Sequence, residues 1–265
     1  MGVLAVKLAL APALVVGASL ITRRFGPRLG GLAAALPAVA GPVLLVFALD
    51  HGAAFAADAA AAALLGVVAL TVFIVTFSRV AYRFGWASSL AIGWFACGVT
   101  AVALAQVDLP REAALGAAYA SIVAAMLLLP TPGHAASPAE PPRWDLPMRA
   151  LATIALVVAL TALAGELGST VSGVFTPFPV IAAILAAFTH GQSDPDTVVR
   201  VMRGLLGGLF AFAGFFYVLA LALAGSGEIA QSFAIALTAG LAIQLLALLA
   251  THRADRGQAM QKATR

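Results

Sequence analysis

Two histidines that are each followed by glycine, His51 and His190, are the side chains of this chain best suited to exchange a proton. Imidazole titrates near neutral pH, so a histidine at the end of an apolar segment could serve in gating or solute binding. A structural interpretation is also open: a His-Gly pair can simply end a helix, because glycine adopts the left-handed conformation of a helix cap.

Three charged residues lie in or at the edge of long apolar segments, where an ionisable group is costly and therefore a candidate for coupling transport to an ion: Lys7, Asp58 and Glu166. Each also fits the membrane interface. Asp58 begins an apolar segment, Glu166 ends one, and Lys7 is long enough to extend its ammonium group to the surface.

Sequence motifs for catalysis and for metal binding are missing. The chain contains no HExxH, no Gly-x-Ser-x-Gly, no phosphate-binding loop, and no spacing typical of a zinc or calcium site. We therefore expect no enzyme activity, no cofactor and no metal.

Glycine and proline interrupt two apolar segments in a similar pattern. Proline removes a backbone donor and frees a carbonyl, and at membrane depth such a group persists only inside protein or beside a watery cavity. The alternative is that these prolines merely bend their helices. The candidate solute-binding or gating residues in the two segments are Gly31, Pro37, Gly41, Pro42, Thr176, Pro177, Phe178 and Pro179.

Apolar helices must position these residues. Hydrophobic residues make up 62% of the 265-residue chain and charged residues only 10%, against roughly a quarter charged in soluble domains. This excludes a soluble enzyme domain, and the single cysteine excludes a disulfide-stapled module. The pattern predicts an all-α polytopic membrane protein with about nine transmembrane helices. The predicted spans are residues 3–22, 29–49, 57–82, 86–107, 113–129, 149–166, 170–189, 199–223 and 228–250.

Basic residues predict the orientation of these spans. Every Lys and Arg except Lys7 and Arg111 falls in alternate loops that would share one side of the membrane. Positively charged loops stay in the cytoplasm, so we expect the N-terminus outside and the C-terminus inside a bacterial inner membrane. The net charge of +4 then needs no nucleic-acid partner.

An internal repeat predicts how the spans are grouped. Residues 29–37 align with residues 171–179, which pairs Gly31 with Gly173 and Pro37 with Pro179. We expect a four-helix repeat in residues 1–111, a linking helix and proline-rich cytoplasmic loop in 112–148, a second four-helix repeat in 149–250, and a basic cytoplasmic tail in 251–265. The single linking helix of this 4+1+4 plan inverts the second repeat relative to the first.

The run of residues 30–37, GGLAAALP, followed by an apolar stretch and Asp-His-Gly at residues 50–52, resembles the GlpM-type family of small four-helix bacterial inner-membrane proteins. The duplicated unit is similar in architecture to the drug/metabolite transporter superfamily. These resemblances imply a membrane location and a four-helix unit, and they transfer no binding residue. Small multidrug resistance proteins carry a membrane-embedded glutamate in their first helix, and residues 3–22 contain none, which argues against that coupling device here.

Together these patterns predict a secondary transporter or flippase-like carrier for a small organic or amphipathic solute, working by alternating access between inverted repeats. A non-catalytic membrane scaffold of envelope metabolism and a passive channel are the alternatives. The expected partners are the lipid bilayer and a small-molecule or lipid-like solute, and the sequence leaves a homodimer open.

Overall fold

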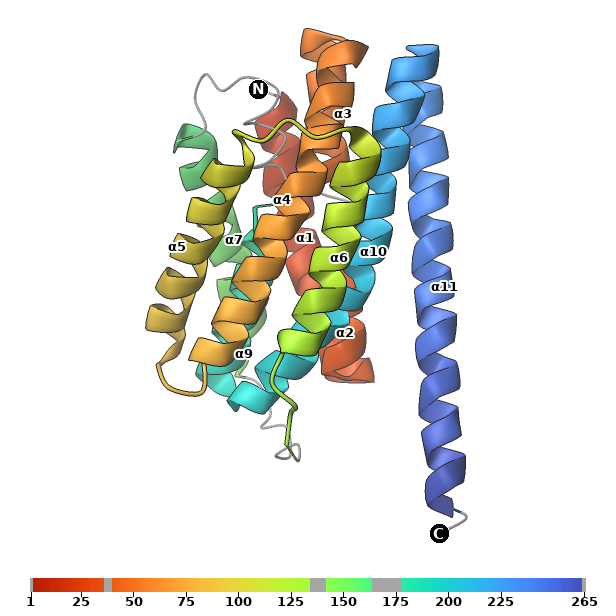
Figure 1. Cartoon of the computed structure of the whole chain (residues 1–265). Helices are drawn as coiled ribbons and strands as arrows, with labels where there is room; N and C mark the ends of the chain where they lie inside the picture. Colours follow the sequence, from red (N-terminus) through yellow and green to blue (C-terminus); the bar gives the residue numbers. More distant parts are fainter. Residues whose placement is uncertain (1, 36–39, 134–141, 164–177, 264–265) are drawn as a thin grey trace.

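The computed structural model describes residues 2–35, 40–133, 142–163 and 178–263, and within these ranges it contains helices and no strand. In chain order the helices are α1 (Gly2–Phe25), α2 (Pro27–Ala34), α3 (Ala40–His51), α4 (Ala53–Val80), α5 (Trp86–Leu104), α6 (Arg111–Leu128), α7 (Asp145–Leu163), α9 (Val180–Gln192), α10 (Pro195–Ser226) and α11 (Ile229–Ala263) (Figure 1). Five of them, α4, α5, α6, α10 and α11, are long and apolar enough to cross a membrane. The chain is therefore an all-α, multi-pass membrane protein.

Two predicted segments differ from the helices found. The predicted span 29–49 is divided between two helices: α2 ends at Ala34, where the N–H of Ala35 donates to the Leu32 carbonyl at 3.3 Å, and α3 begins at Ala40. The predicted basic tail, residues 251–265, continues α11 as far as Ala263.

Single glycines join α1 to α2 and α3 to α4. Gly26 has φ 95° and ψ 166°, and Gly52 has φ 91° and ψ 166°. Side chains rarely tolerate this region of backbone space, which is nearly exclusive to glycine. The two junctions therefore share one sharp conformation and contain no further residue.

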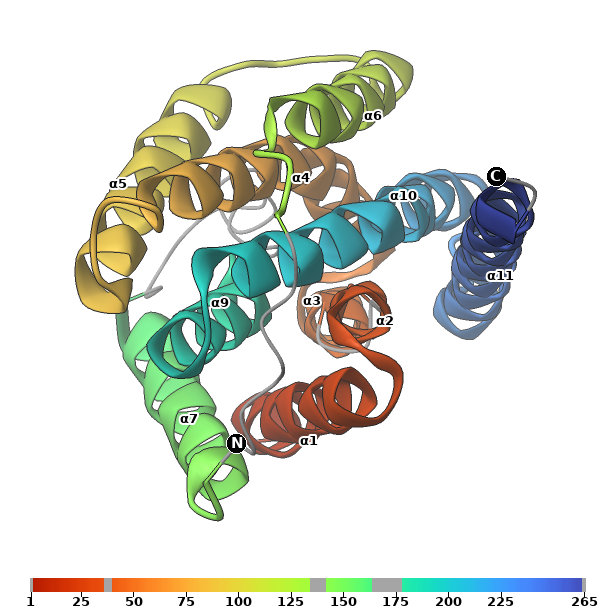
Figure 2. The same cartoon turned by 90° about the horizontal axis from the view of Figure 1, so that it is seen from below.

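Two long helices whose side chains are largely buried, α4 and α10, form the centre of the bundle. Helix α4 packs against α3, α5, α6 and α10, and α10 packs against α2, α4, α6, α9 and α11. Figure 2 shows α10 passing through the middle of the bundle, with α11 at its edge. Four aromatic side chains, Phe73 and Phe77 on α4 and Phe215 and Phe216 on α10, are fully buried and fill the core around these two helices.

Helices α2 and α10 cross with their backbones in contact. A Cβ atom added to Gly31 would lie 2.0 Å from the carbonyl oxygen of Val201, and one added to Gly204 would lie 2.0 Å from that of Arg28. Small residues at a helix crossing permit this approach in membrane proteins, where packing rather than water exclusion drives association. The crossing fixes α2 on the central helix.

Most described basic residues gather at one end of the bundle, which we call the basic end. It is the lower end in Figure 1, where α1, α4, α6 and α9 finish and α7 and α10 begin. Its basic residues are Arg23, Arg24, Arg28, Arg79, Arg83, Arg143, Arg149, Arg200 and Arg203. Which side of a membrane this end faces stays a prediction.

Candidate functional site

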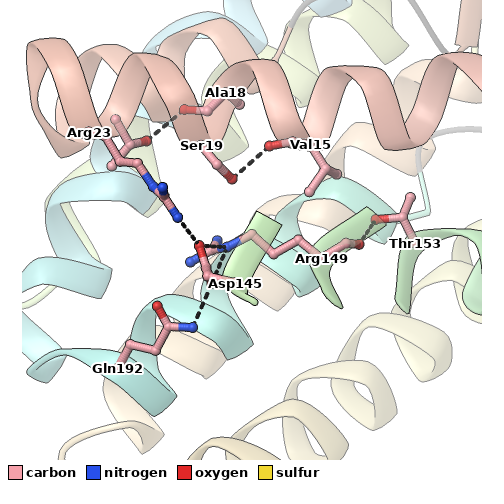
Figure 3. Close-up of polar contacts among 9 residues, drawn as sticks. Val15, Ala18, Ser19, Arg23, Asp145, Arg149, Thr153 and Gln192 are labelled. Carbon is pink, nitrogen blue, oxygen red and sulfur yellow. Dashed lines mark hydrogen bonds and ion pairs between the residues drawn. The ribbon is translucent and has the colours of Figure 1, made fainter. Parts of the chain in front are cut away.

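A buried ionic cluster joins three helices at the basic end (Figure 3). The carboxylate of Asp145, the first residue of α7, lies 2.7 Å from Nη2 of Arg23 on α1 and 2.8 Å from Nε of Arg149, one turn further along α7. Gln192, the last residue of α9, donates from Nε2 to Oδ1 of Asp145 at 2.5 Å. One carboxylate therefore accepts hydrogen bonds from side chains of α1, α7 and α9. We call these four residues the ionic latch.

Local sequence places the charges of the latch where helix dipoles favour them. Arg23 lies in the last turn of α1, next to its free carbonyls, and Asp145 lies in the first turn of α7, next to its free N–H groups. The spacing of four residues puts Asp145 and Arg149 on the same face of α7.

Burial makes the pairing within the latch necessary. Asp145 is 1% exposed and Arg149 is 7% exposed. Burial alone would raise the pKa of the Asp145 carboxyl, but hydrogen bonds from Gln192, Arg149 and Arg23 outweigh it and hold the pKa of Asp145 below its usual value. The carboxylate is thus charged at neutral pH, and two guanidinium groups share it, so the latch carries a surplus of positive charge.

A second layer of contacts orients Arg149. Its guanidinium carbon lies 5.0 Å from the centre of the Phe188 ring on α9, a distance suited to a cation–π contact. Its carbonyl accepts a hydrogen bond from Oγ1 of Thr153 at 2.6 Å. The Phe188 ring therefore packs on the guanidinium that pairs with Asp145, whereas the Thr153 bond is made to the backbone of α7.

Hydrogen bonds and ion pairs of this kind form and break without covalent change. The latch is thus suited to hold α1, α7 and α9 together at the basic end and to release them. Within the described ranges no group of three or more His, Cys, Asp or Glu side chains is placed to hold a metal ion.

The two predicted histidines lie at opposite ends of the bundle. His51 is exposed at the end of α3, where its ring stacks on Phe55 with centroids 4.6 Å apart, and the positive φ of Gly52 follows it. The helix-end interpretation thus describes His51. His190 also lies in the last turn of its helix, but Gly191 is not the cap, because α9 continues to Gln192 and Ser193 caps it. The half-buried His190 ring lies edge-on to Phe77 at 5.9 Å, and its Nδ1 has no hydrogen-bond partner among the described residues.

The first predicted glycine and proline set faces α10. Gly31 lies against the α10 backbone, and a Cβ on Gly41 would lie 3.7 Å from the ring of Phe215. Pro42 is half-buried in α3, and Pro37 lies outside the described residues.

The second set faces α5 where it is described. The half-buried ring of Phe178 lies 6.2 Å from that of Trp94, and buried Pro179 directly precedes α9. Thr176 and Pro177 lie outside the described residues. The contacts described for the two sets therefore do not bring them into one site.

The coupling candidates are placed in part. Asp58 is exposed near the start of α4, at the end of the bundle opposite the latch, and its Oδ1 lies 3.8 Å from Nη2 of Arg111. This position agrees with the interfacial interpretation of Asp58. Lys7 belongs to α1, and its side chain lies outside the described part of the structure, as does Glu166.

Sequence reasoning missed the latch, because it treated the arginines as topology signals and Asp145 as part of a linker. One signal was available: an aspartate and an arginine four residues apart at the start of an apolar helix favour a local ion pair. No pattern in the sequence indicates Arg23, which is 122 residues away from Asp145.

No protein-family model matches the chain, and neither a curated protein nor a solved structure is significantly similar to it. The likeness to GlpM-type proteins and to drug/metabolite transporters stays a prediction.

Proposed function

We propose that the protein is a secondary transporter or flippase-like carrier that moves a small organic or amphipathic solute by alternating access between two inverted halves. The observation that carries the proposal is the pattern of helix packing. Each described helix of the first half except α2 has a counterpart in the second: α1 corresponds to α7, α3 to α9, α4 to α10 and α5 to α11. For most pairs of these helices that are in contact, the two counterparts are also in contact.

The correspondence holds for every such pair but one: the α1–α9 contact has no counterpart of similar extent between α7 and α3. The α3–α4 and α9–α10 contacts exchange, as do α4–α5 and α10–α11, and also α5–α9 and α11–α3. The α1–α7 and α4–α10 pairs map onto themselves, and the linking helix α6 packs on both α4 and α10. This is the arrangement expected of a two-fold axis through the bundle.

Helix direction supports inversion. Helix α4 ends at the basic end and its counterpart α10 begins there. Inverted repeats with discontinuous helices are a recurring plan of secondary transporters, with the solute bound where the halves meet. The division of the second predicted segment into α2 and α3 supplies one such discontinuity.

In this proposal the ionic latch closes the basic end. It joins α1 of the first half to α7 and α9 of the second, so breaking it would separate the halves there. The positive-inside rule assigns this end to the cytoplasm of a bacterial cell.

A non-transporting scaffold is the second candidate, and one observation favours it. The contact between the α2 and α10 backbones at Gly31 and Gly204 ties the two halves rigidly, which suits a platform better than a moving carrier.

Cysteine accessibility distinguishes the two. Single cysteines would replace Pro42 and Phe178, both half-buried, in a chain whose buried Cys97 is changed to Ala. A membrane-impermeant maleimide is then applied from each side in proteoliposomes, with and without Arg23→Gln. This change weakens the latch and leaves Asp145 paired with Arg149 and Gln192.

For a carrier, Arg23→Gln increases labelling from the basic side and decreases it from the opposite side. Arg24→Gln is the matched control, because this exposed neighbour contacts only the Phe25 ring at 5.7 Å among the described residues. Labelling that is unchanged, or that rises from both sides together, contradicts alternating access and favours the scaffold.

A further inference from the structure

A groove opens at the basic end where α4 and α6 finish. Its volume is about 650 Å³, and its walls include Arg79, Arg83 and Phe84 on one side and the segment from Leu127 to Thr131 on the other. Both helices end at the lower side of the bundle in Figure 1. From the position and chemistry of this groove we infer that it binds the headgroup of one anionic phospholipid, whose acyl chains lie along α6.

The polar part of the groove is positively charged. Arg79 donates from Nε and Nη2 to the carbonyl oxygen of Leu128 at 3.0 and 2.8 Å, which fixes its guanidinium at the wall and leaves Nη1 available. Arg83, one turn further along, is exposed and has no ion-pair partner within the described ranges. No acidic residue is among the described residues that line the groove.

Two described acids at this end, Asp194 and Asp196, make hydrogen bonds to other groups, and neither forms an ion pair with Arg79 or Arg83 among the described residues. The hydroxyl of Tyr82 donates to Asp196, and the carboxylate of Asp194 accepts the N–H of Thr197 at 2.7 Å as the cap of α10. The two arginines of the groove are therefore free to bind a phosphate, which guanidinium groups bind with strong charge-assisted hydrogen bonds.

The wall formed by the end of α6 is held in place from behind. Nη2 of Arg203, on α10, donates to the carbonyl oxygens of Leu129 and Pro130 at 3.3 and 3.1 Å. A preformed wall reduces the ordering cost of binding.

The edge of the groove is apolar and exposed. Leu127 is 81% exposed, Leu128 is 50% exposed and Phe84 is 51% exposed. A soluble anion would use the arginines alone and leave these side chains uncovered. A phospholipid uses both parts, because its headgroup lies at the level of the arginines while its chains cover the leucines, and basic pockets between membrane helices suit anionic headgroups.

Native mass spectrometry of the full-length protein, titrated with phosphatidylglycerol or with phosphatidylcholine, tests the inference. We expect one phosphatidylglycerol to bind more tightly than phosphatidylcholine. Arg83→Gln should weaken that binding about fivefold, the effect of about one arginine at a membrane surface. Arg24→Gln removes the same charge from another exposed position at the basic end and should leave it unchanged.

A second pair of variants tests the apolar part. Leu127→Ser should weaken phosphatidylglycerol binding, whereas Leu245→Ser, at a 57% exposed leucine on α11, should not. Excess inorganic phosphate should compete poorly. The inference would be overturned if the two lipids bound with equal affinity, or if Arg83→Gln and Arg24→Gln had equal effects. It would also be overturned if phosphate displaced the lipid and Leu127→Ser had no effect. The result does not depend on whether the protein transports a solute.

Discussion

The guanidinium of Arg23, in the last turn of α1, lies 2.7 Å from the carboxylate of Asp145, in the first turn of α7. The pair connects the two helices that correspond to each other as the first of each proposed half. Asp145 is almost fully buried and Arg23 is about one-third exposed, so Asp145 depends on this pair more than Arg23 does.

Replacing Asp145 by Asn should destabilise the fold strongly. The change leaves the buried guanidinium of Arg149 without a counter-ion, and breaking a buried pair in this way costs about 3–5 kcal/mol. Thermal unfolding in detergent measures the loss. Asp196→Asn, at the same end and paired with the exposed Tyr82, should cost far less; equal losses would contradict the assigned role of Asp145.

The latch should also fail in acid. Because the folded-state pKa of Asp145 is lowered, its contribution is fully present above the unfolded-state pKa of about 4 and is lost as the pH falls through the folded-state value. The difference in unfolding temperature between the wild type and Asp145→Asn should therefore be constant near neutral pH and shrink below about pH 4. A difference that shrinks as the pH rises would have the wrong sign.

Adding a methyl group at the α2–α10 crossing should separate the two helices. Gly204→Ala places a Cβ 2.0 Å from the Arg28 carbonyl oxygen, so a backbone must move. Gly116→Ala on α6 is the matched control, since nothing lies within 4 Å of its Cβ. Gly116→Ala should leave the free energy of unfolding unchanged or raise it by up to about 1 kcal/mol, which is the difference in helix propensity between alanine and glycine. Gly204→Ala should clearly lower the free energy of unfolding.

Gln244 should contribute little despite its burial. Its Nε2 donates to the Leu32 carbonyl at 3.0 Å, but its Oε1 has no partner among the described residues, and the N–H of Ala35 donates to the same carbonyl. The gain from one hydrogen bond, about 1 kcal/mol, is offset by the unpaired oxygen. The unfolding temperature of Gln244→Leu should thus lie within a few degrees of that of Thr238→Val, a change at an exposed position on the same helix. A large loss would mean that Oε1 is paired.

Where the structure describes the chain, most predicted spans coincide with a helix, because long apolar runs have few alternatives in a membrane. Five of the described helices are long and apolar enough to cross a membrane, whereas the sequence predicted nine spans. Helix α4 differs from its predicted bounds, 57–82, by only a few residues. The ends were harder: nothing in the apolar pattern distinguishes the basic residues that continue α11 from an irregular tail, since lysine and arginine are good helix formers.

The site was harder to predict than the fold. The sequence directed attention to residues with unusual types, such as His51, which is exposed at a helix end. The latch instead combines common residues that only tertiary packing brings together. In the sequence, Arg23 indicated only the topology. Its role depends on Asp145 and Gln192, and hydrophobic periodicity cannot show that these residues lie near Arg23.

The equal conformations of Gly26 and Gly52 have a mechanical consequence. Each is a one-residue joint, one at the basic end and one at the opposite end, and neither contributes a loop that could lengthen. The start of α2 and the end of α3 are thus attached to their neighbours without a spare residue. Neither helix can shift away from the helix it joins unless the backbone angles of its glycine change.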